Sequence, residues 1–77
     1  MPSILYINGY RVGFFSADGD EPPHVHVRKG GEQAKFWLAP VQLAKNAGFA
    51  RHELKEIFDL VQEHQQELLK GWHDYFG

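Results

Sequence analysis

Residues 24–38 have the sequence HVHVRKGGEQAKFWL, two alternating runs on either side of a glycine pair. Alternation of apolar and polar side chains is typical of strands that bury one face, so we expect strands at about 24–29 and 34–38. If the glycine pair forms a two-residue hairpin loop, Lys29 lies opposite Glu32, and directly opposed residues share a face. The apolar face then comprises Val25, Val27, Ala34 and Phe36, and the other face carries His24, His26, Lys35 and Trp37.

An earlier hairpin is predicted around Asn8-Gly9, because a type I′ turn needs a positive φ angle at both central residues. Its strands should cover about 3–7 and 10–16. The following segment, SADGDEPP at 16–23, predicts a loop because it combines acids, a glycine and two prolines. The expected cross-strand pairs of this first hairpin are Ile7–Tyr10, Tyr6–Arg11, Leu5–Val12 and Ile4–Gly13.

Two helices are expected after the second hairpin. Pro40 suits the first turn of a helix and Gly48 the position just past its end, which predicts a short helix at about 40–47. Apolar side chains then recur with helical spacing over about 51–76, which predicts a long amphipathic helix. Gln65 falls inside its apolar stripe and therefore needs a hydrogen-bond partner. Together the elements predict a single α+β domain, with two N-terminal hairpins forming a small sheet that a short helix and a long C-terminal helix cover.

The long helix should be longer than the sheet beneath it. Roughly 25 residues at 1.5 Å each span about 38 Å, whereas strands of five or six residues span about 17–20 Å. We therefore expect the helix to overhang the sheet or to bend near Gly71. Its end carries Trp72, Tyr75 and Phe76, which we expect to be buried by a second copy of the chain or by a partner protein.

The composition indicates a small soluble protein with one core. The chain has 77 residues, 43% of them hydrophobic, and no cysteine, so neither a disulfide nor a thiolate metal site can form. No segment has the pattern of a signal peptide or a membrane span, so we expect a cytoplasmic protein without membrane association. The net charge of −2 excludes a strongly basic nucleic-acid module. Acids concentrate after residue 50, which is compatible with a local basic face on the N-terminal half.

The block E-P-P-H-V-H-V at residues 21–27 is the most informative segment for chemistry. Alternation puts His24 and His26 on one side of a strand, away from the core face, and imidazoles exchange protons near neutral pH. We expect them to act as catalytic acid and base on a phosphodiester, with Lys35 stabilising the transition-state charge. Because both imidazoles are expected to be exposed, replacing either should abolish activity and leave the fold intact. The candidate substrate-binding residues are Arg28, Lys29 and Trp37.

Two other interpretations of this pattern remain open. Alternating histidines on a strand can simply form a solvated face. The H-x-H spacing also supplies two ligands to a metal ion, and Asp18, Asp20 or Glu21 could complete such a site. We expect no metal and no other cofactor, because no third histidine or cysteine has a fitting spacing nearby.

The chain contains the segments P-S-I-L-Y-I-N-G-Y-R at 2–11, E-P-P-H-V-H-V at 21–27, A-K-F-W-L-A-P at 34–40 and H-E-L-K-E-I at 52–57. These four segments resemble a family of small bacterial domains of unknown function. The resemblance covers essentially the whole chain and departs from the family pattern at Ala39 and Ala50, where members tend to have an acid and a hydroxyl residue. It implies a gene beside that of a second small protein, and the role of toxin in a toxin–antitoxin pair.

These observations lead to one expected function and two alternatives. We expect the toxin component of a bacterial pair, neutralised by a cognate small antitoxin and acting on RNA through His24 and His26. A metal-independent endoribonuclease is the expected activity, since RNA carries its own 2′-hydroxyl nucleophile. The alternatives are a non-catalytic, antitoxin-like interaction or regulatory module, and a small metal-binding domain that uses the same histidine pair.

Overall fold

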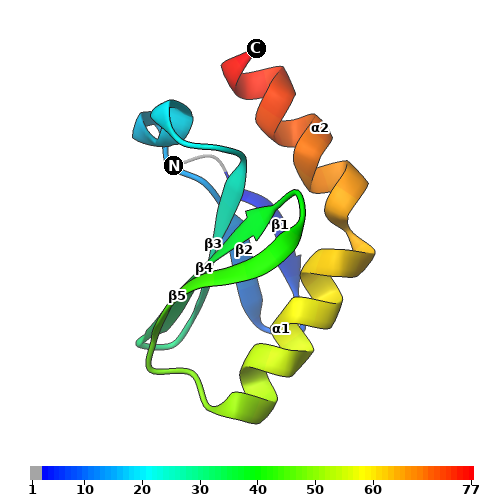
Figure 1. Ribbon diagram of the computed structural model, residues 1–77. Coiled ribbons are helices and arrows are strands. Elements are labelled where there is room, and N and C mark those ends of the chain that lie inside the picture. Colours follow the sequence, from blue (N-terminus) through cyan, green and yellow to red (C-terminus); the bar gives the residue numbers. More distant parts are fainter. Residues whose placement is uncertain (1–2) are drawn as a thin grey trace.

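The computed structural model describes residues 3–77 and consists of one five-stranded sheet with two helices packed on one of its faces (Figure 1). Neighbouring strands are antiparallel and follow the order of the sequence, so the predicted α+β class is confirmed. The elements are β1 (Ser3–Ile7), β2 (Tyr10–Gly13), the 3-10 helix η1 (Ser16–Asp20), β3 (His24–Lys29), β4 (Glu32–Leu38), β5 (Val41–Ala47), α1 (Arg51–Glu63) and α2 (Gln65–Phe76).

Both predicted hairpins form. The glycine pair connects β3 to β4, and the predicted pairing of Lys29 with Glu32, which sets the register of this hairpin, is present. At the first hairpin, Asn8 and Gly9 have φ angles of 52° and 82°, as a type I′ turn requires. One expected pair is wrong, because an irregularity in β1 places Ser3, and not Ile4, opposite Gly13.

The second strand is shorter than the predicted segment 10–16. β2 ends at Gly13, and the predicted loop begins with η1. Asp18 holds this turn together. Its backbone N–H donates to the Phe15 carbonyl at 3.0 Å, and its Oδ2 accepts from the Phe15 N–H at 2.8 Å. The side chain of Asp18 is thereby fixed in place just ahead of β3.

The predicted short helix at 40–47 is wrong, because this segment forms β5. Leu38 pairs with Val41 across a tight turn at Ala39 and Pro40, whose peptide bond is cis. Proline suits such turns as well as helix starts, so its position was compatible with either structure. Pairing with β5 satisfies the backbone groups along β4, and this gain overrides the weak local preference for a helix.

The helices cover the predicted apolar face of the sheet, whose four residues are all buried. α1 packs on β4 and β5 and adds Ile57, Leu60 and Val61 to the core. The predicted need of Gln65 for a partner is confirmed, since its Nε2 donates to the Leu38 carbonyl at 2.6 Å. None of the helices in the described part of the chain is long and apolar enough to cross a membrane.

The predicted long helix is two helices, because it breaks at His64 and not near Gly71. The imidazole Nδ1 of His64 donates to the Leu60 carbonyl at 3.0 Å, beside the backbone bond to the same oxygen. α2 then continues past the sheet (Figure 1). Trp72 is only 4% exposed within its own chain, so the expectation that another chain must cover it is wrong. Association through the exposed Tyr75 stays a prediction.

Candidate functional site

Three side chains with metal-binding chemistry converge at the start of β3. Alternation along the strand places His24 and His26 on the face opposite to the core, as predicted, with ring centroids 5.1 Å apart. η1 brings Asp18 to them. Oδ2 of Asp18 accepts a hydrogen bond of 3.0 Å from Nε2 of His26 and lies 3.3 Å from Nε2 of His24. The three residues offer ligand atoms that all lie within 4.8 Å of one another.

His24 is fully buried, which corrects the expectation that both imidazoles are exposed. The rings of Trp37 and Trp72 pack against it at centroid distances of 5.6 and 5.0 Å. Its Nδ1 donates to the Pro22 carbonyl at 2.9 Å, so Nε2 carries a lone pair in the neutral imidazole. This Nε2 has no hydrogen-bond partner in the described part of the chain and lies beside the Asp18 carboxylate. Buried polar atoms in folded proteins nearly always have a partner, and a bound water molecule or ion is one way to supply it.

The electrostatics of the cluster favour the protonation states of Asp18 and His26 that bind metals. Partial burial acts to raise the pKa of the Asp18 carboxyl, but the Phe15 N–H and the two imidazoles outweigh it and lower that pKa below its ordinary value. Burial lowers the pKa of His26, and the attraction of Asp18 offsets only part of that effect. The prevailing forms near neutral pH are therefore a carboxylate and a neutral imidazole, which are the forms that coordinate a cation.

Lys35 and Trp37 also lie at the cluster, as predicted from the register. Lys35 is opposite His26 on β4, and its Nζ forms an ion pair of 2.5 Å with Oε1 of Glu21. The hydrogen bond from Lys35 lowers the pKa of Glu21. The same ammonium lies 4.6 Å from the ring centre of Trp37. Because Trp37 packs on His24, it forms part of the wall around this imidazole.

The structure separates the two remaining predicted residues. Arg28 shares the face of His26, two residues further along β3, and is exposed. Lys29 is the next residue on the strand, so its side chain points to the other face, which the helices cover. Its Nζ lies 4.8 Å from the ring centre of Tyr10. Lys29 is thus not part of the site around the histidines.

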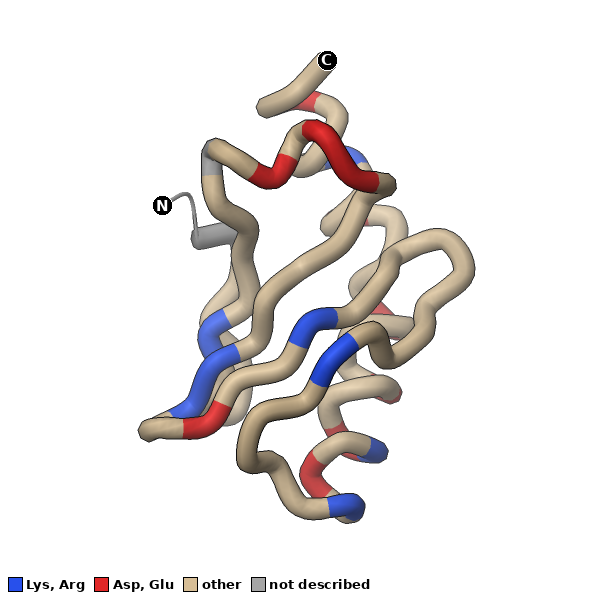
Figure 2. Tube along the Cα trace, turned by 60° about the vertical axis from the view of Figure 1, so that its left-hand side comes forward, with Lys and Arg blue, Asp and Glu red and all other residues tan. Residues whose placement is uncertain are grey.

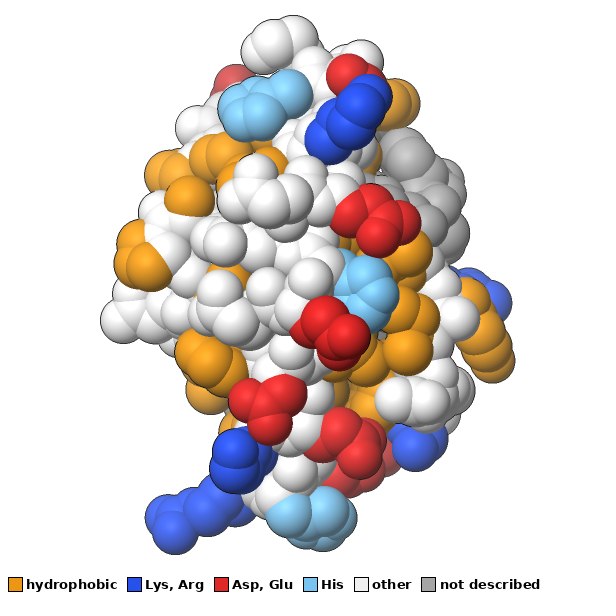
Figure 3. Space-filling view, turned by 90° about the vertical axis from the view of Figure 1, so that its right-hand side faces the viewer, with side chains coloured by type: hydrophobic (Ala, Val, Ile, Leu, Met, Phe, Trp, Pro, Cys, Tyr) orange, Lys and Arg blue, Asp and Glu red, His pale blue; other side chains and the backbone are white. Residues whose placement is uncertain are grey.

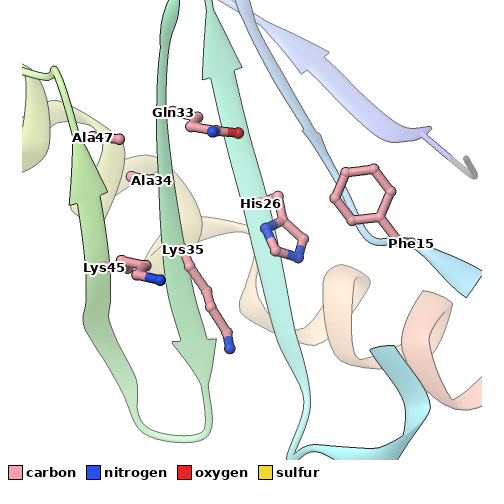
Figure 4. A pocket seen from close by; sticks show the side chains of 7 residues that line it. All are labelled: Phe15, His26, Gln33, Ala34, Lys35, Lys45 and Ala47. Carbon is pink, nitrogen blue, oxygen red and sulfur yellow. The ribbon is translucent and has the colours of Figure 1, made fainter. Parts of the chain in front are cut away.

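A pocket of about 300 Å³ adjoins His26 on the open face of the sheet (Figure 4). Phe15 packs on His26 with ring centroids 4.8 Å apart, and Lys45 of β5 lies directly opposite Lys35. Sequence reasoning missed Phe15, which fell inside a predicted strand, and Lys45, which fell inside a predicted helix. Strand alternation through β5 would have placed Lys45 beside Lys35. Asp18, by contrast, was one of three acids expected to be able to complete a site.

The fold and the cluster define a small α+β protein with a strand-borne histidine pair and one carboxylate. The chain belongs to the family described as a domain of unknown function, DUF4160, whose family model matches residues 9–73. No curated protein and no solved structure matches the chain. The predicted membership of an uncharacterised domain family is thereby confirmed, and the family description assigns no activity.

Proposed function

We propose that this protein binds one divalent transition-metal ion through Asp18, His24 and His26 and uses it in a hydrolytic reaction. The observation that carries the proposal is Nε2 of His24, a buried ring nitrogen without a hydrogen-bond partner that faces the other two ligand atoms. A metal ion at this point would satisfy that nitrogen and balance the charge of Asp18.

The distances from Asp18 to the two imidazoles fit a metal site. In a tetrahedral zinc site with bonds of about 2.0–2.1 Å, two ligand atoms lie about 3.3 Å apart. Oδ2 of Asp18 lies 3.0 and 3.3 Å from the two imidazole nitrogens. The groups behind the ligands support the same role, since Pro22 accepts from His24 and Phe15 donates to Asp18. Such hydrogen bonds orient metal ligands and fix the tautomer of a histidine.

Burial also favours a metal ligand over the acid–base pair expected from the sequence. A residue that transfers a proton must reach the reacting atoms. The side chain of His24 is 0% exposed, whereas that of His26 is 20% exposed. His24 therefore suits coordination, and a proton-transfer role for His26 stays a prediction.

The site has the features of a catalytic metal centre. Three protein ligands leave a coordination position for water or substrate, whereas structural zinc sites use four. Two imidazoles and a carboxylate also suit Fe²⁺, so the donor set defines a class of metals. Lys35 and Lys45 line the pocket beside His26, where they would hold an anionic group. Hydrolysis of a phosphodiester is the reaction that this combination supports best.

Titration of the metal-free protein with Zn²⁺ and Co²⁺ tests the metal centre. Calorimetry should give one ion per chain, and Co²⁺ should develop visible absorption bands. His26→Ala should weaken binding by at least about tenfold, whereas His73→Ala, which removes an exposed histidine of α2, should bind as the wild type does. A folded wild-type protein that takes up no ion, or an unchanged affinity in His26→Ala, would refute the proposal. Hydrolysis of bis(p-nitrophenyl) phosphate, lost with a chelator and restored by metal, tests the reaction.

The toxin role implied by the family resemblance, its antitoxin partner and its cytoplasmic location stay predictions. A phosphodiesterase that acts on RNA would be compatible with a toxin. Expression of the chain alone, and then with its neighbouring gene, checks the role. Growth arrest that the neighbour relieves supports a toxin, and the absence of arrest favours the non-catalytic interaction module.

A further inference from the structure

Beyond the end that η1 and Trp72 cover, one face of the sheet carries no helix, and the charged side chains of its strands are all basic. Glu32 is the only acid in the described strands. It lies two residues from the buried Ala34 on β4, so its side chain points to the opposite face. Figure 2 shows basic positions on successive strands of the sheet. The open face carries Arg11 on β2, Arg28 on β3, Lys35 on β4 and Lys45 on β5.

These cations stand in pairs that the fold itself does not favour. Arg11 lies directly opposite Arg28, and Lys35 directly opposite Lys45. Like charges in directly opposed positions of neighbouring strands destabilise a sheet. Glu21 compensates Lys35, but the other three cations form no ion pair within residues 3–77. An uncompensated row of cations across a sheet indicates an anionic ligand.

Exposed aromatic rings stand beside this row. Tyr6, opposite Arg11, is 71% exposed, and Phe15, against His26, is 38% exposed. A row of cations alone would suit any polyanion, including an acidic peptide. Exposed rings beside phosphate-binding cations are the means by which proteins hold single-stranded nucleic acids, because unpaired bases stack on them.

The helix side of the molecule has the opposite charge (Figure 3). Its acids outnumber its bases, so a polyanion is repelled from that side and directed to the open face. The separation explains how a chain of net charge −2 can still present a cationic surface. The acids of α1 and α2 are Glu53, Glu56, Asp59, Glu63, Glu67 and Asp74, against Arg51, Lys55 and Lys70.

We propose that the open face of the sheet binds a single-stranded nucleic acid. Its phosphates contact the four cations of β2–β5, and its bases stack on Tyr6 and Phe15. The inference deepens the proposed function and rests on it in one respect: the bound strand is the substrate of the metal centre. The pocket beside His26, with Lys35 and Lys45 at its wall, is where the strand meets that centre (Figure 4).

Fluorescence anisotropy with a labelled 12-nucleotide oligouridine and the matching oligodeoxyuridine tests the surface and distinguishes RNA from DNA. Arg28→Glu and Lys45→Gln should each weaken binding by about tenfold at low salt and make the salt dependence less steep, by about 0.7 in log–log slope for a single lost phosphate contact. Tyr6→Ala should weaken it about fivefold or more through lost stacking. Lys55→Glu, a charge reversal on α1, is the matched control and should bind as the wild type does. Competition by polyglutamate as strong as by RNA would overturn the inference in favour of an acidic protein partner.

Metal titration of the same variants separates the two proposals. Arg28→Glu should keep wild-type metal affinity while its affinity for oligonucleotide falls. Metal binding together with unchanged oligonucleotide affinity in both Arg28→Glu and Lys45→Gln would overturn the open-face inference alone. Oligonucleotide binding that these variants weaken, in a protein that takes up no metal, would refute the metal centre and leave the surface standing.

Discussion

His24 and His26 lie two residues apart on the same face of β3, yet their surroundings differ. His24 is enclosed between the indole rings of Trp37 and Trp72. His26 borders an open pocket beside Phe15. Their side chains point to the same side of the sheet because the residues are two apart on the strand. Their environments differ because α2 covers His24, whereas His26 lies further from that helix.

Alanine substitution of the two histidines should lower the stability of the fold by different amounts. His24→Ala is expected to lower the free energy of unfolding of the metal-free protein by about 2–4 kcal/mol, because it opens a cavity and leaves the Pro22 carbonyl without its donor. His26→Ala should cost about 1 kcal/mol or less, since its side chain is partly exposed. Urea denaturation measures both, with His73→Ala as the exposed control. Equal costs at positions 24 and 26 would contradict the described burial.

Tyr10 makes the stability of the fold sensitive to alkali. Burial, together with the nearby carboxylates of Glu56 and Glu53, raises the pKa of its phenol from 10.0 to about 12. The fold favours the neutral phenol, so this contribution is complete below a pH of about 10 and is lost as the pH rises towards about 12. Tyr10→Phe should therefore unfold at a higher pH than the wild type in circular dichroism. Tyr75→Phe, at an exposed position, should not shift the transition.

At the scale of elements, η1 and α2 fit closely against each other. A Cβ atom added at Gly19 would lie 2.8 Å from the ring of Phe76. Because η1 also carries Asp18, the end of α2 packs on the element that brings Asp18 to the two histidines. The packing of two elements distant in sequence thereby helps to position Asp18.

Gly19→Ala should consequently weaken metal binding by about tenfold, because either η1 or the Phe76 ring must shift and a shift of η1 takes Asp18 with it. Gly31→Ala is the matched control, since nothing lies within 4 Å of a Cβ atom at that position. Titration with Zn²⁺, with circular dichroism to confirm folding, compares the two variants. Wild-type affinity in a folded Gly19→Ala would show that this contact does not position Asp18.

At the scale of the whole molecule, the aromatic end of α2 folds onto its own chain. Trp72 packs on Phe14 and His24 at centroid distances of 5.4 and 5.0 Å. Trp72→Ala should therefore lower the free energy of unfolding by about 3–5 kcal/mol, measured in urea. Light scattering on Tyr75→Ala checks the separate prediction of a homo-oligomer. A smaller mass than that of the wild type supports the oligomer, and an equal mass contradicts it.

The sequence by itself determined those features of the fold that depend on residues close together along the chain. The glycine pair and the alternation around it specify the register of β3 and β4, and with it the common face of His24, His26 and Lys35. The Asn8-Gly9 turn and the helical stripe after residue 50 are equally local patterns. A hairpin turn and a side-chain period restrict the backbone strongly enough to be recognised without the rest of the fold.

Only the tertiary structure decided which element residues 40–47 form, which histidine is buried and which acid reaches the histidine pair. The segment at 40–47 is a strand because β4 offers it a partner, although its proline and glycine also suit a helix. His24 is buried because α2 brings Trp72 to it, and Asp18 joins the histidine pair because η1 folds towards β3. Periodicity states which face a side chain occupies, whereas its burial depends on residues far along the chain, whose approach local preferences do not encode.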